Sequence, residues 1–307
     1  MSGTFQTLLK LRLAFVQDSN RGWYAAPAEL WIRSARSQNV EILLFLFSRK
    51  GKDFRMLKNQ SRIGIFSGNA LKIIAAISML LDHMGVLLFP NLMILRYLGR
   101  VALPIFAFMI AEGCRYTRRK GRYFLLVFLL GFGCQAAYYV VSQSLYLNIL
   151  LSFSLSILII FALQTAKKAW FAPSLPFFKR ALQTLPFLAM LGAAVLLNLF
   201  FTFDYGIWGM LLPVFAALLH PAGEDTPKAV RKLDQNLFHV LCLTVGMMAL
   251  IAVNQSRQWY SLLALPFLLL YSGKRGKANM KYFFYIFYPL HLVILEGIRL
   301  LISMINA

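Results

Sequence analysis

Long apolar runs joined by short polar connectors fill the chain from about residue 70 onward. An α-helix needs about 20 such residues to cross about 30 Å of hydrocarbon. The runs occupy residues 70–89, 93–114, 122–142, 146–164, 183–202, 206–220, 237–254, 258–272 and 282–303. The sixth and eighth runs are short, as tilted, interfacial or half-buried helices are. Because apolar residues do not alternate with polar ones, membrane β-strands are excluded. The pattern predicts an all-α fold, a polytopic membrane helix bundle with about nine transmembrane or membrane-embedded helices.

Residues 1–68 follow a different pattern, in which apolar residues are scattered and no run is long enough to span a membrane. This segment carries 11 lysines and arginines against four aspartates and glutamates. We expect a basic, cytoplasmic and partly disordered N-terminal extension over residues 1–68 that can lie along anionic lipid. Residues 69–307 then form the transmembrane domain.

The composition agrees with a membrane protein. Of the 307 residues, 59% are hydrophobic and only 14% are charged, and the mean hydropathy is +0.65. A soluble domain of this length needs more polar surface to cover its core. The net charge of +21 would favour nucleic-acid binding in a soluble protein. Here the basic residues lie mainly in the connectors, so we expect membrane lipid, and no nucleic acid, as a partner.

The charge alternates from one connector to the next. Sixteen lysines and arginines lie in the connectors 115–122, 165–181, 221–236 and 273–281. The intervening connectors, FPNL, SQSLY, FTFDY and NQSRQ, contain Arg257 as their one basic residue. Basic connectors stay on the cytoplasmic side of a membrane, so the asymmetry predicts a cytoplasmic N-terminus and an external C-terminus.

The run SMLLDHMGVLLF (78–89) contains two ionisable residues, Asp82 and His83, in the outer half of the first predicted span. An ionisable group in a span costs about 2.5–3.5 kcal/mol on insertion scales, which makes it a candidate functional group. Neighbouring residues of a helix point about 100° apart, so the two side chains need not bond each other but can face one cavity. A carboxylate can also orient an imidazole for proton abstraction.

Two arginines follow after a short connector. Arg96 and Arg100 are four residues apart, hence on one helix face, within reach of Asp82. One interpretation is a structural Asp–Arg pair. The other uses the second positive charge, which suits an anionic ligand or an oxyanion.

Further polar groups lie in or beside the predicted spans. Glu112 ends the second span, and Asn148 is placed inside the fourth. Asp204 lies at an outer border in FDYGIWG, and His291 follows Pro289 in FYIFYPLHL, next to Tyr288. We predict Asp82, His83 and His291 as catalytic residues. The predicted binding residues are Arg96, Arg100, Glu112, Asn148, Asp204 and Tyr288. No metal-ligand spacing is present, and the three cysteines are expected to pack in the core.

Five segments occur in a characteristic order: LKIIAAISMLLDHMG, LGRVALPIFAFMIAEGCRYTRR, LNILLSFSL, FDYGIWGML and KYFFYIFYPLHLVIL. Over about residues 70–303, and with its D-H-x-G, G-R-x-x-x-P and Y-P-x-H elements, the chain resembles the TraX family. The namesake of that family acetylates the amino terminus of F-type conjugative pilin. The usual aromatic residue of the family's arginine motif is replaced here by Leu103, an apolar-for-apolar change.

The resemblance implies a multi-pass acyltransferase of the bacterial inner (plasma) membrane that draws an acyl group, acetyl in the first instance, from acetyl-CoA, with no permanently bound cofactor. It implies that the motif residues are Asp82, His83, Arg100, Glu112, Asp204 and His291. His83, supported by Asp82, is then the base, Arg96 and Arg100 hold an oxyanion or an anionic acceptor, and basic connectors hold coenzyme A phosphates. The acceptor stays open between a protein N-terminus and a surface glycan or lipid. A cytoplasmic donor reaches Asp82 only through a cavity between helices, or if the spans are shorter and deeper than predicted.

A proton-coupled transporter is the alternative, with Asp82, His83 and His291 as a relay. Transporters often have two halves with matching broken spans. One proline-interrupted span occurs near the C-terminus, and no counterpart is evident in the first half. A purely structural assembly factor is a third interpretation, but it leaves the buried charges unexplained.

Overall fold

The computed structural model describes residues 15–18, 22–25, 64–254, 257–278 and 280–305. The chain divides into two units, residues 1–60 and 61–307. In the first unit, β1 (Phe15–Asp18) pairs antiparallel with β2 (Gly22–Ala25). The apolar pattern did not predict this hairpin. Residues 64–68, the end of the predicted extension, are described with the second unit, where Gly68 begins α4 (Gly68–Leu87). The expected partial disorder and lipid contact of the extension fall on residues outside the described ones.

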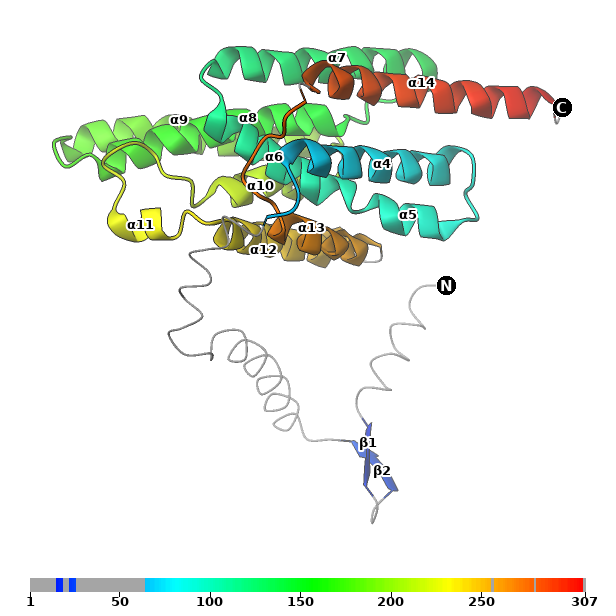
Figure 1. Ribbon diagram of the computed structural model, residues 1–307, viewed down its shortest axis with the longest axis horizontal. Coiled ribbons are helices and arrows are strands. Elements are labelled where there is room, and N and C mark those ends of the chain that lie inside the picture. Colours follow the sequence, from blue (N-terminus) through cyan, green and yellow to red (C-terminus); the bar gives the residue numbers. More distant parts are fainter. Residues whose placement is uncertain (1–14, 19–21, 26–63, 255–256, 279, 306–307) are drawn as a thin grey trace. The chain divides into compact units, whose positions relative to one another are not determined.

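The described part of the second unit is helical, which confirms the predicted all-α bundle (Figure 1). Its elements are α4 (Gly68–Leu87), α5 (Met93–Gly99), α6 (Ala102–Tyr116), α7 (Lys120–Ser142), α8 (Ile149–Phe171), α9 (Phe177–Phe200), α10 (Gly206–Ala217), α11 (Lys228–Lys232), α12 (Asn236–Asn254), the 3₁₀ helix η2 (Gln258–Ala264), α13 (Leu265–Leu269) and α14 (Lys281–Ile305).

Seven of the described helical segments are long and apolar enough to cross a membrane, and two shorter apolar segments accompany them. The shorter ones, α10 and the η2–α13 segment, are the two runs predicted to be short. Two boundaries differ most from the prediction. α8 continues to Phe171, and α9 begins at Phe177, because basic and aromatic residues at helix ends lie at the membrane interface and do not interrupt helical backbone.

The second predicted span is broken into α5 and α6 around Arg100 and Val101. Pro104 explains the break, because it has no N–H to bond the carbonyl of Arg100 four residues earlier. Proline is tolerated in the first turn of α6, where N–H groups lack helical partners in any case.

The hydrophobic core is formed mainly by α4, α6, α8, α10 and α12. Its most deeply buried side chains include Phe108, Ile157, Met210, Leu212 and Leu243. In contrast, α9 and α14 lie at the periphery, and almost none of their residues is buried. Leu199, Phe200, Val293 and Ile305 are among their exposed apolar side chains. Such large exposed apolar faces are expected of helices that contact lipid.

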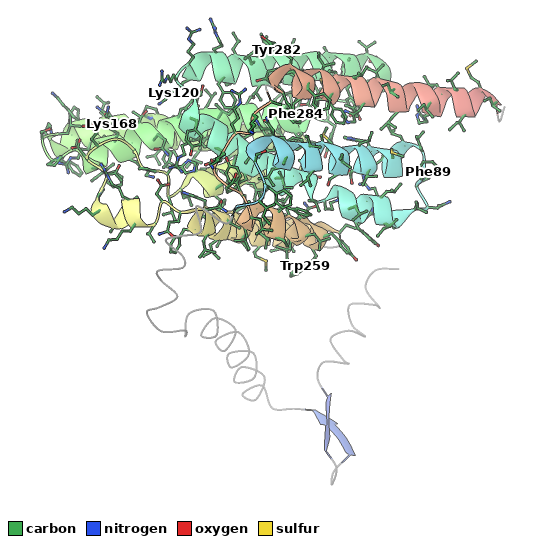
Figure 2. The ribbon with its side chains drawn as sticks, in the orientation of Figure 1. Phe89, Lys120, Lys168, Trp259, Tyr282 and Phe284 are labelled. Carbon is green, nitrogen blue, oxygen red and sulfur yellow. The ribbon has the colours of Figure 1, made fainter. Side chains whose placement is uncertain are left out.

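The helices run roughly side by side, so the unit has two ends (Figure 1). Lys120 and Lys168 lie at one end and Phe89 at the other (Figure 2). We call the first the basic end; it includes the connectors 117–119, 172–176 and 218–227. The opposite end includes the connectors 88–92, 143–148 and 201–205. The last two of these are tied together by the parallel bridge between Leu147 and Phe203.

Candidate functional site

Asp82 is held by both predicted arginines. Its Oδ2 lies 2.9 Å from Nη1 of Arg96, and its Oδ1 lies 3.5 Å from Nη2 of Arg100. Close packing of α5 on α4 makes this possible. A Cβ added to Gly99 would lie 2.8 Å from the backbone Cα of Asp82. The expected Asp–Arg contact is therefore present, with both arginines on one carboxylate.

Arg100 also reaches the connector at the opposite end, where Nη1 donates to the hydroxyl of Tyr205 over 2.7 Å. Tyr205 has φ +60° and Gly206 has φ +56°, so two successive residues are left-handed at the start of α10. Such a conformation is costly for a tyrosine and is maintained by its surroundings. It places the phenol beside Arg100.

Asp204 is a second carboxyl group in this region. It accepts a hydrogen bond of 3.0 Å from the hydroxyl of Tyr146. Burial raises the pKa of Asp204 to about 6, although the Tyr146 bond and the nearby Arg100 act in the opposite direction. The net charge of the group formed by Asp82, Arg96, Arg100 and Asp204 therefore changes near neutral pH. With Asp204 protonated, two arginines face the single carboxylate of Asp82.

His83 pairs with His291, which lies 208 residues away in sequence. Nδ1 of His291 is 2.8 Å from the carbonyl oxygen of Phe287, and Nε2 of His291 is 3.0 Å from Nδ1 of His83. A carbonyl only accepts, so Nδ1 of His291 carries a proton. When both rings are neutral, Nε2 of His291 must accept from His83. Nε2 of His83 is then left unprotonated, with a lone pair for a base.

Asp82 was predicted to support His83, and the structure gives that position to His291. No hydrogen bond joins Asp82 to His83 among the described residues, because the carboxylate faces the arginines of α5. His291 comes from α14, which packs on α4. The side chain of His291 is 4% exposed. The two predicted catalytic histidines are thus brought together, and Asp82 lies beside them.

A cavity of about 890 Å³ connects this group to the basic end. At one extreme it is lined by Asp82, His83 and Asp204, and at the other by Arg118, Arg119 and Arg122. Its walls come from α4, α6, α7 and α14 and are largely apolar and aromatic. Ala102 and Tyr116 both line it, so the cavity follows the whole of α6, about 20 Å.

The remaining predicted binding residues lie in different places. Tyr288 lines the large cavity close to the histidine pair, and Glu112 lines it nearer the basic end. Asn148 is not inside a span, because α8 begins after it. Its side-chain oxygen accepts from the N–H groups of Leu150 and Leu151, and its amide donates to the carbonyl of Gly131 over 2.8 Å. This side chain is an N-cap that also ties α8 to α7.

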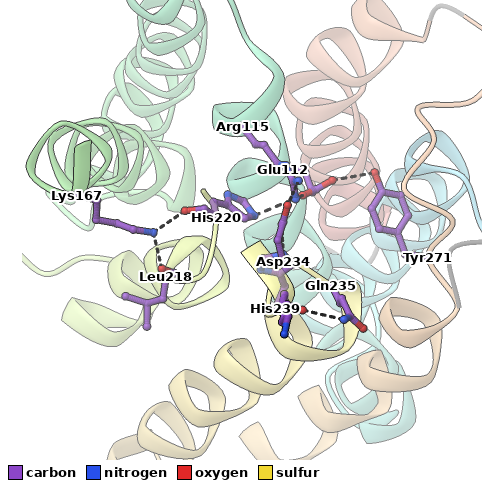
Figure 3. A network of polar contacts seen from close by, with 10 residues as sticks. Glu112, Arg115, Lys167, Leu218, His220, Asp234, Gln235, His239 and Tyr271 are labelled. Atoms are coloured by element: carbon purple, nitrogen blue, oxygen red, sulfur yellow. Dashed lines mark hydrogen bonds and ion pairs between the residues drawn. The ribbon is translucent and has the colours of Figure 1, made fainter. Parts of the chain in front are cut away.

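Glu112 belongs to a second polar cluster, which the sequence did not reveal (Figure 3). Tyr271 donates to Glu112 over 3.2 Å, and Nε2 of His220 lies 3.6 Å from the same carboxylate. Arg115 bonds Asp234 at 2.7 Å, and His239 bonds the other oxygen of Asp234 at 3.0 Å. Glu112, His220 and His239 are each less than a tenth exposed.

Burial and neighbouring charges determine the charge states of Asp234 and His220 in this cluster. Burial would raise the pKa of Asp234, but the His239 hydrogen bond and Arg115 hold it below its usual range. Burial, then the His239 ring and Arg115, lower the pKa of His220 well below its usual range, so this imidazole is neutral. The rings of His220 and His239 meet edge to face with centroids 4.7 Å apart. One local signal was available in the sequence, since Asp234 and His239 flank the start of α12.

Comparison with known proteins fits this architecture. The family model described as TraX protein matches residues 67–299. A Dichelobacter nodosus protein, described as "Probable fimbrial assembly protein FimC, serogroup H1", is 28% identical over 257 residues, 78% of this chain and 98% of the relative. A Rickettsia prowazekii protein, described as "Uncharacterized protein RP591", is 50% identical over 38 residues, 12% of this chain and 15% of the relative. No solved structure matches the chain. Because the family match spans most of the sequence, from the N-cap of α4 into the last turns of α14, this membrane protein belongs to the TraX family.

Proposed function

We propose that the protein is an integral-membrane acyltransferase of the bacterial inner membrane. It transfers an acyl group, acetyl in the first instance, from a coenzyme A thioester to an amine or hydroxyl. The observation that carries this proposal is the single cavity joining the arginine-lined turn 118–122 to His83. With the N-terminus cytoplasmic, the basic end faces the soluble donor, and the histidines lie toward the other side of the membrane.

The donor enters from the basic end. Arg118, Arg119 and Arg122 supply cations for its phosphates. The pantetheine arm is long, thin and weakly polar, so it suits a channel of apolar and aromatic side chains about 20 Å in length. The thioester carbonyl then lies beside His83. This route removes the need for shorter or deeper spans.

In the reaction, Nε2 of His83 takes the proton from the acceptor N–H or O–H as its nitrogen or oxygen attacks the thioester carbonyl. Donors on Arg100 or Arg96 stabilise the oxyanion of the tetrahedral intermediate. The C–S bond then breaks, and the departing sulfur receives the proton held by His83. His291 keeps Nδ1 of His83 engaged, so the base presents Nε2 throughout.

The acceptor we favour is a protein amino terminus exposed at the membrane, with a surface glycan or lipid as the other candidates. The fimbrial description of the Dichelobacter nodosus relative and the pilin acetylation by the family's namesake support a subunit of a surface fibre. An amino terminus is a good nucleophile only when deprotonated, and its pKa of about 8 leaves that proton for a base to remove.

The proposal is tested with purified full-chain protein, acetyl-CoA and a membrane extract, with release of free thiol and acetylated product followed by mass spectrometry. His83→Ala should lower the rate by about 10²–10⁴ and leave acetyl-CoA binding within a few-fold. His291→Ala should also slow transfer, and the double variant should be little worse, because the two residues act as a unit. Met84→Ala, the next position along α4, serves as the control. Normal turnover by a folded His83→Ala variant would rule out His83 as the general base.

A proton-coupled transporter is the second candidate, because Asp82, His83, Asp204 and His291 form a polar group at the end of one cavity. The two candidates differ in outcome. Acetyl-CoA consumption with product in detergent, where no gradient exists, supports the enzyme. Proton-driven solute uptake by sealed vesicles, with acetyl-CoA left intact, supports the transporter.

A further inference from the structure

A second cavity, of about 650 Å³, lies at the basic end between α6, α7, α8 and the connector 218–227. Its basic lining residues are Arg115, Lys120, Lys168 and His220, with no aspartate or glutamate among the described residues that line it. Arg115 is already neutralised by Asp234 and Glu112. The positive charge of the cavity therefore comes from Lys120 and Lys168.

Neither of these lysines has a carboxylate partner within the described part of the chain. Nζ of Lys120 lies 5.1 Å from the centroid of the Phe161 ring, and the stem of Lys168 runs along Gly223. Phe161 and Gly223 also line the cavity. Both lysines thus line a space in which no described carboxylate lies. An anion is the natural complement of two such cations.

Two buried polar atoms of the wall have no hydrogen-bond partner in the described protein: Nε2 of Gln164 and Nδ1 of His220. His220 is 3% exposed. Its Nε2 faces Glu112 at 3.6 Å, so the neutral ring leaves Nδ1 as an acceptor. The Gln164 amide is a donor. The wall therefore offers a donor for an anionic oxygen and an acceptor for a hydroxyl or amino group.

The first turn of α7 adds further donors. Lys120 is its first residue, and Arg119 at the N-cap makes no side-chain cap. The first N–H groups of a helix lack intrahelical partners and attract phosphate. Thr117, just before this turn, lines both the second cavity and the large one.

We propose that the second cavity binds a phosphorylated organic molecule. Its phosphate lies on Lys120, Lys168 and Gln164, and its less polar part lies against Ile160, Phe161 and Leu175. Two sources share this chemistry, a free nucleotide other than the donor held in the large cavity, and a phospholipid headgroup. Binding requires no acyl transfer, so the inference goes beyond the proposed function.

The test titrates full-chain protein carrying Arg118→Gln/Arg119→Gln/Arg122→Gln, which removes the proposed phosphate site of the large cavity, with adenosine 3′,5′-bisphosphate, which has neither thiol nor acyl group. Saturable binding should weaken about tenfold or more in Lys120→Gln/Lys168→Gln, and about tenfold in Gln164→Leu, which changes no charge. The control, Lys179→Gln/Lys232→Gln, removes two exposed lysines that do not line the cavity and should bind normally. Thermal unfolding checks that each variant is folded. If the double lysine variant is unfolded, Gln164→Leu alone tests the cavity.

The lipid source has its own arm, in nanodiscs of phosphatidylcholine with or without phosphatidylglycerol. Selective retention of phosphatidylglycerol that the cavity variants lose, without bisphosphate binding, identifies the ligand as lipid. Equal bisphosphate and lipid binding by cavity and control variants overturns the proposal. If the second cavity binds its ligand but the protein transfers no acyl group, the proposed acyltransferase function is wrong and the proposed ligand site stands.

Discussion

Gly99 packs the backbone of α5 directly against Asp82 of α4. A Cβ at this position would overlap Asp82, including its backbone Cα at 2.8 Å. Backbone cannot move aside as the end of a flexible side chain can, so Gly99→Ala must push the two helices apart. We expect a loss of about 1–3 kcal/mol in the free energy of unfolding, and a large loss of acyl transfer as the Asp82–Arg pairs separate.

Gly133→Ala is the matched control, because nothing lies within 4 Å of the added Cβ and alanine favours a helix interior. Its thermal unfolding temperature should stay level or rise. If Gly99→Ala unfolds and transfers as the native protein does, the close approach of α5 to Asp82 is wrong.

Asp204 should make stability depend on pH. Its pKa in the folded protein, about 6, is above the ordinary value of an aspartate, so folding favours the protonated form. The resulting stabilisation is complete below about pH 4 and is lost as pH rises through 6. As the pH rises from 5 to 7, the free energy of unfolding of the native protein should fall by about 1 kcal/mol more than that of Asp204→Asn. Thermal unfolding in detergent across this range checks it; parallel curves for the two proteins would contradict the raised pKa.

Residue-level prediction from sequence succeeded where distances along the chain are short. Arg96 and Arg100 follow Asp82 after one tight connector, so their contact was readable from spacing. The partner of His83 was not, because 208 residues separate it from His291 and only the packing of α14 on α4 joins them. His220 and His239 were missed for the same reason, since each sits near a helix end and finds its ring partner through folding.

At the scale of elements, the start of α8 depends on one side chain. Asn148 caps two N–H groups and also bonds the carbonyl of Gly131 on α7. Asn148→Ala should lower the free energy of unfolding by about 1–2 kcal/mol. Asn148→Asp keeps the cap oxygen and should recover part of the loss. Transfer per folded molecule should stay near normal in both; a selective loss of acetyl-CoA or acceptor binding would instead support the predicted binding role of Asn148.

The lengths of the apolar runs predicted the helices well, because the thickness of the hydrocarbon core sets the length of a membrane-spanning helix. Interruptions within a run depend on finer causes. Pro104 separates α5 from α6, and the eighth run became the 3₁₀ helix η2 followed by α13, with Pro266 at the start of the latter. Length and hydropathy do not register such local backbone changes, although the prolines themselves are visible in the sequence.

For the whole molecule, the charge asymmetry makes a prediction about sidedness. In a protein whose native cysteines are replaced by alanine, Ser174→Cys and Lys277→Cys should be protected from an impermeant maleimide in intact cells. Asn91→Cys and Leu145→Cys should react. All four positions are exposed at connectors, so access to reagent depends on the side of the membrane.

Permeabilised cells supply the control, because all four positions should then react alike. Labelling of Ser174→Cys in intact cells would place the basic end outside. A cytoplasmic donor would then have no route through the arginine-lined turn to His83. The proposed entry of the donor from the basic end would be wrong.

The position of α14 has a consequence for the setting in which the protein works. This helix supplies His291, yet it packs mainly on α4, and its C-terminal end extends beyond the other helices (Figure 1). Lipid therefore supports it on most sides. The separation of His83 and His291 then depends on how the surrounding acyl chains position α14, so bilayer thickness becomes a determinant of the spacing within the catalytic pair.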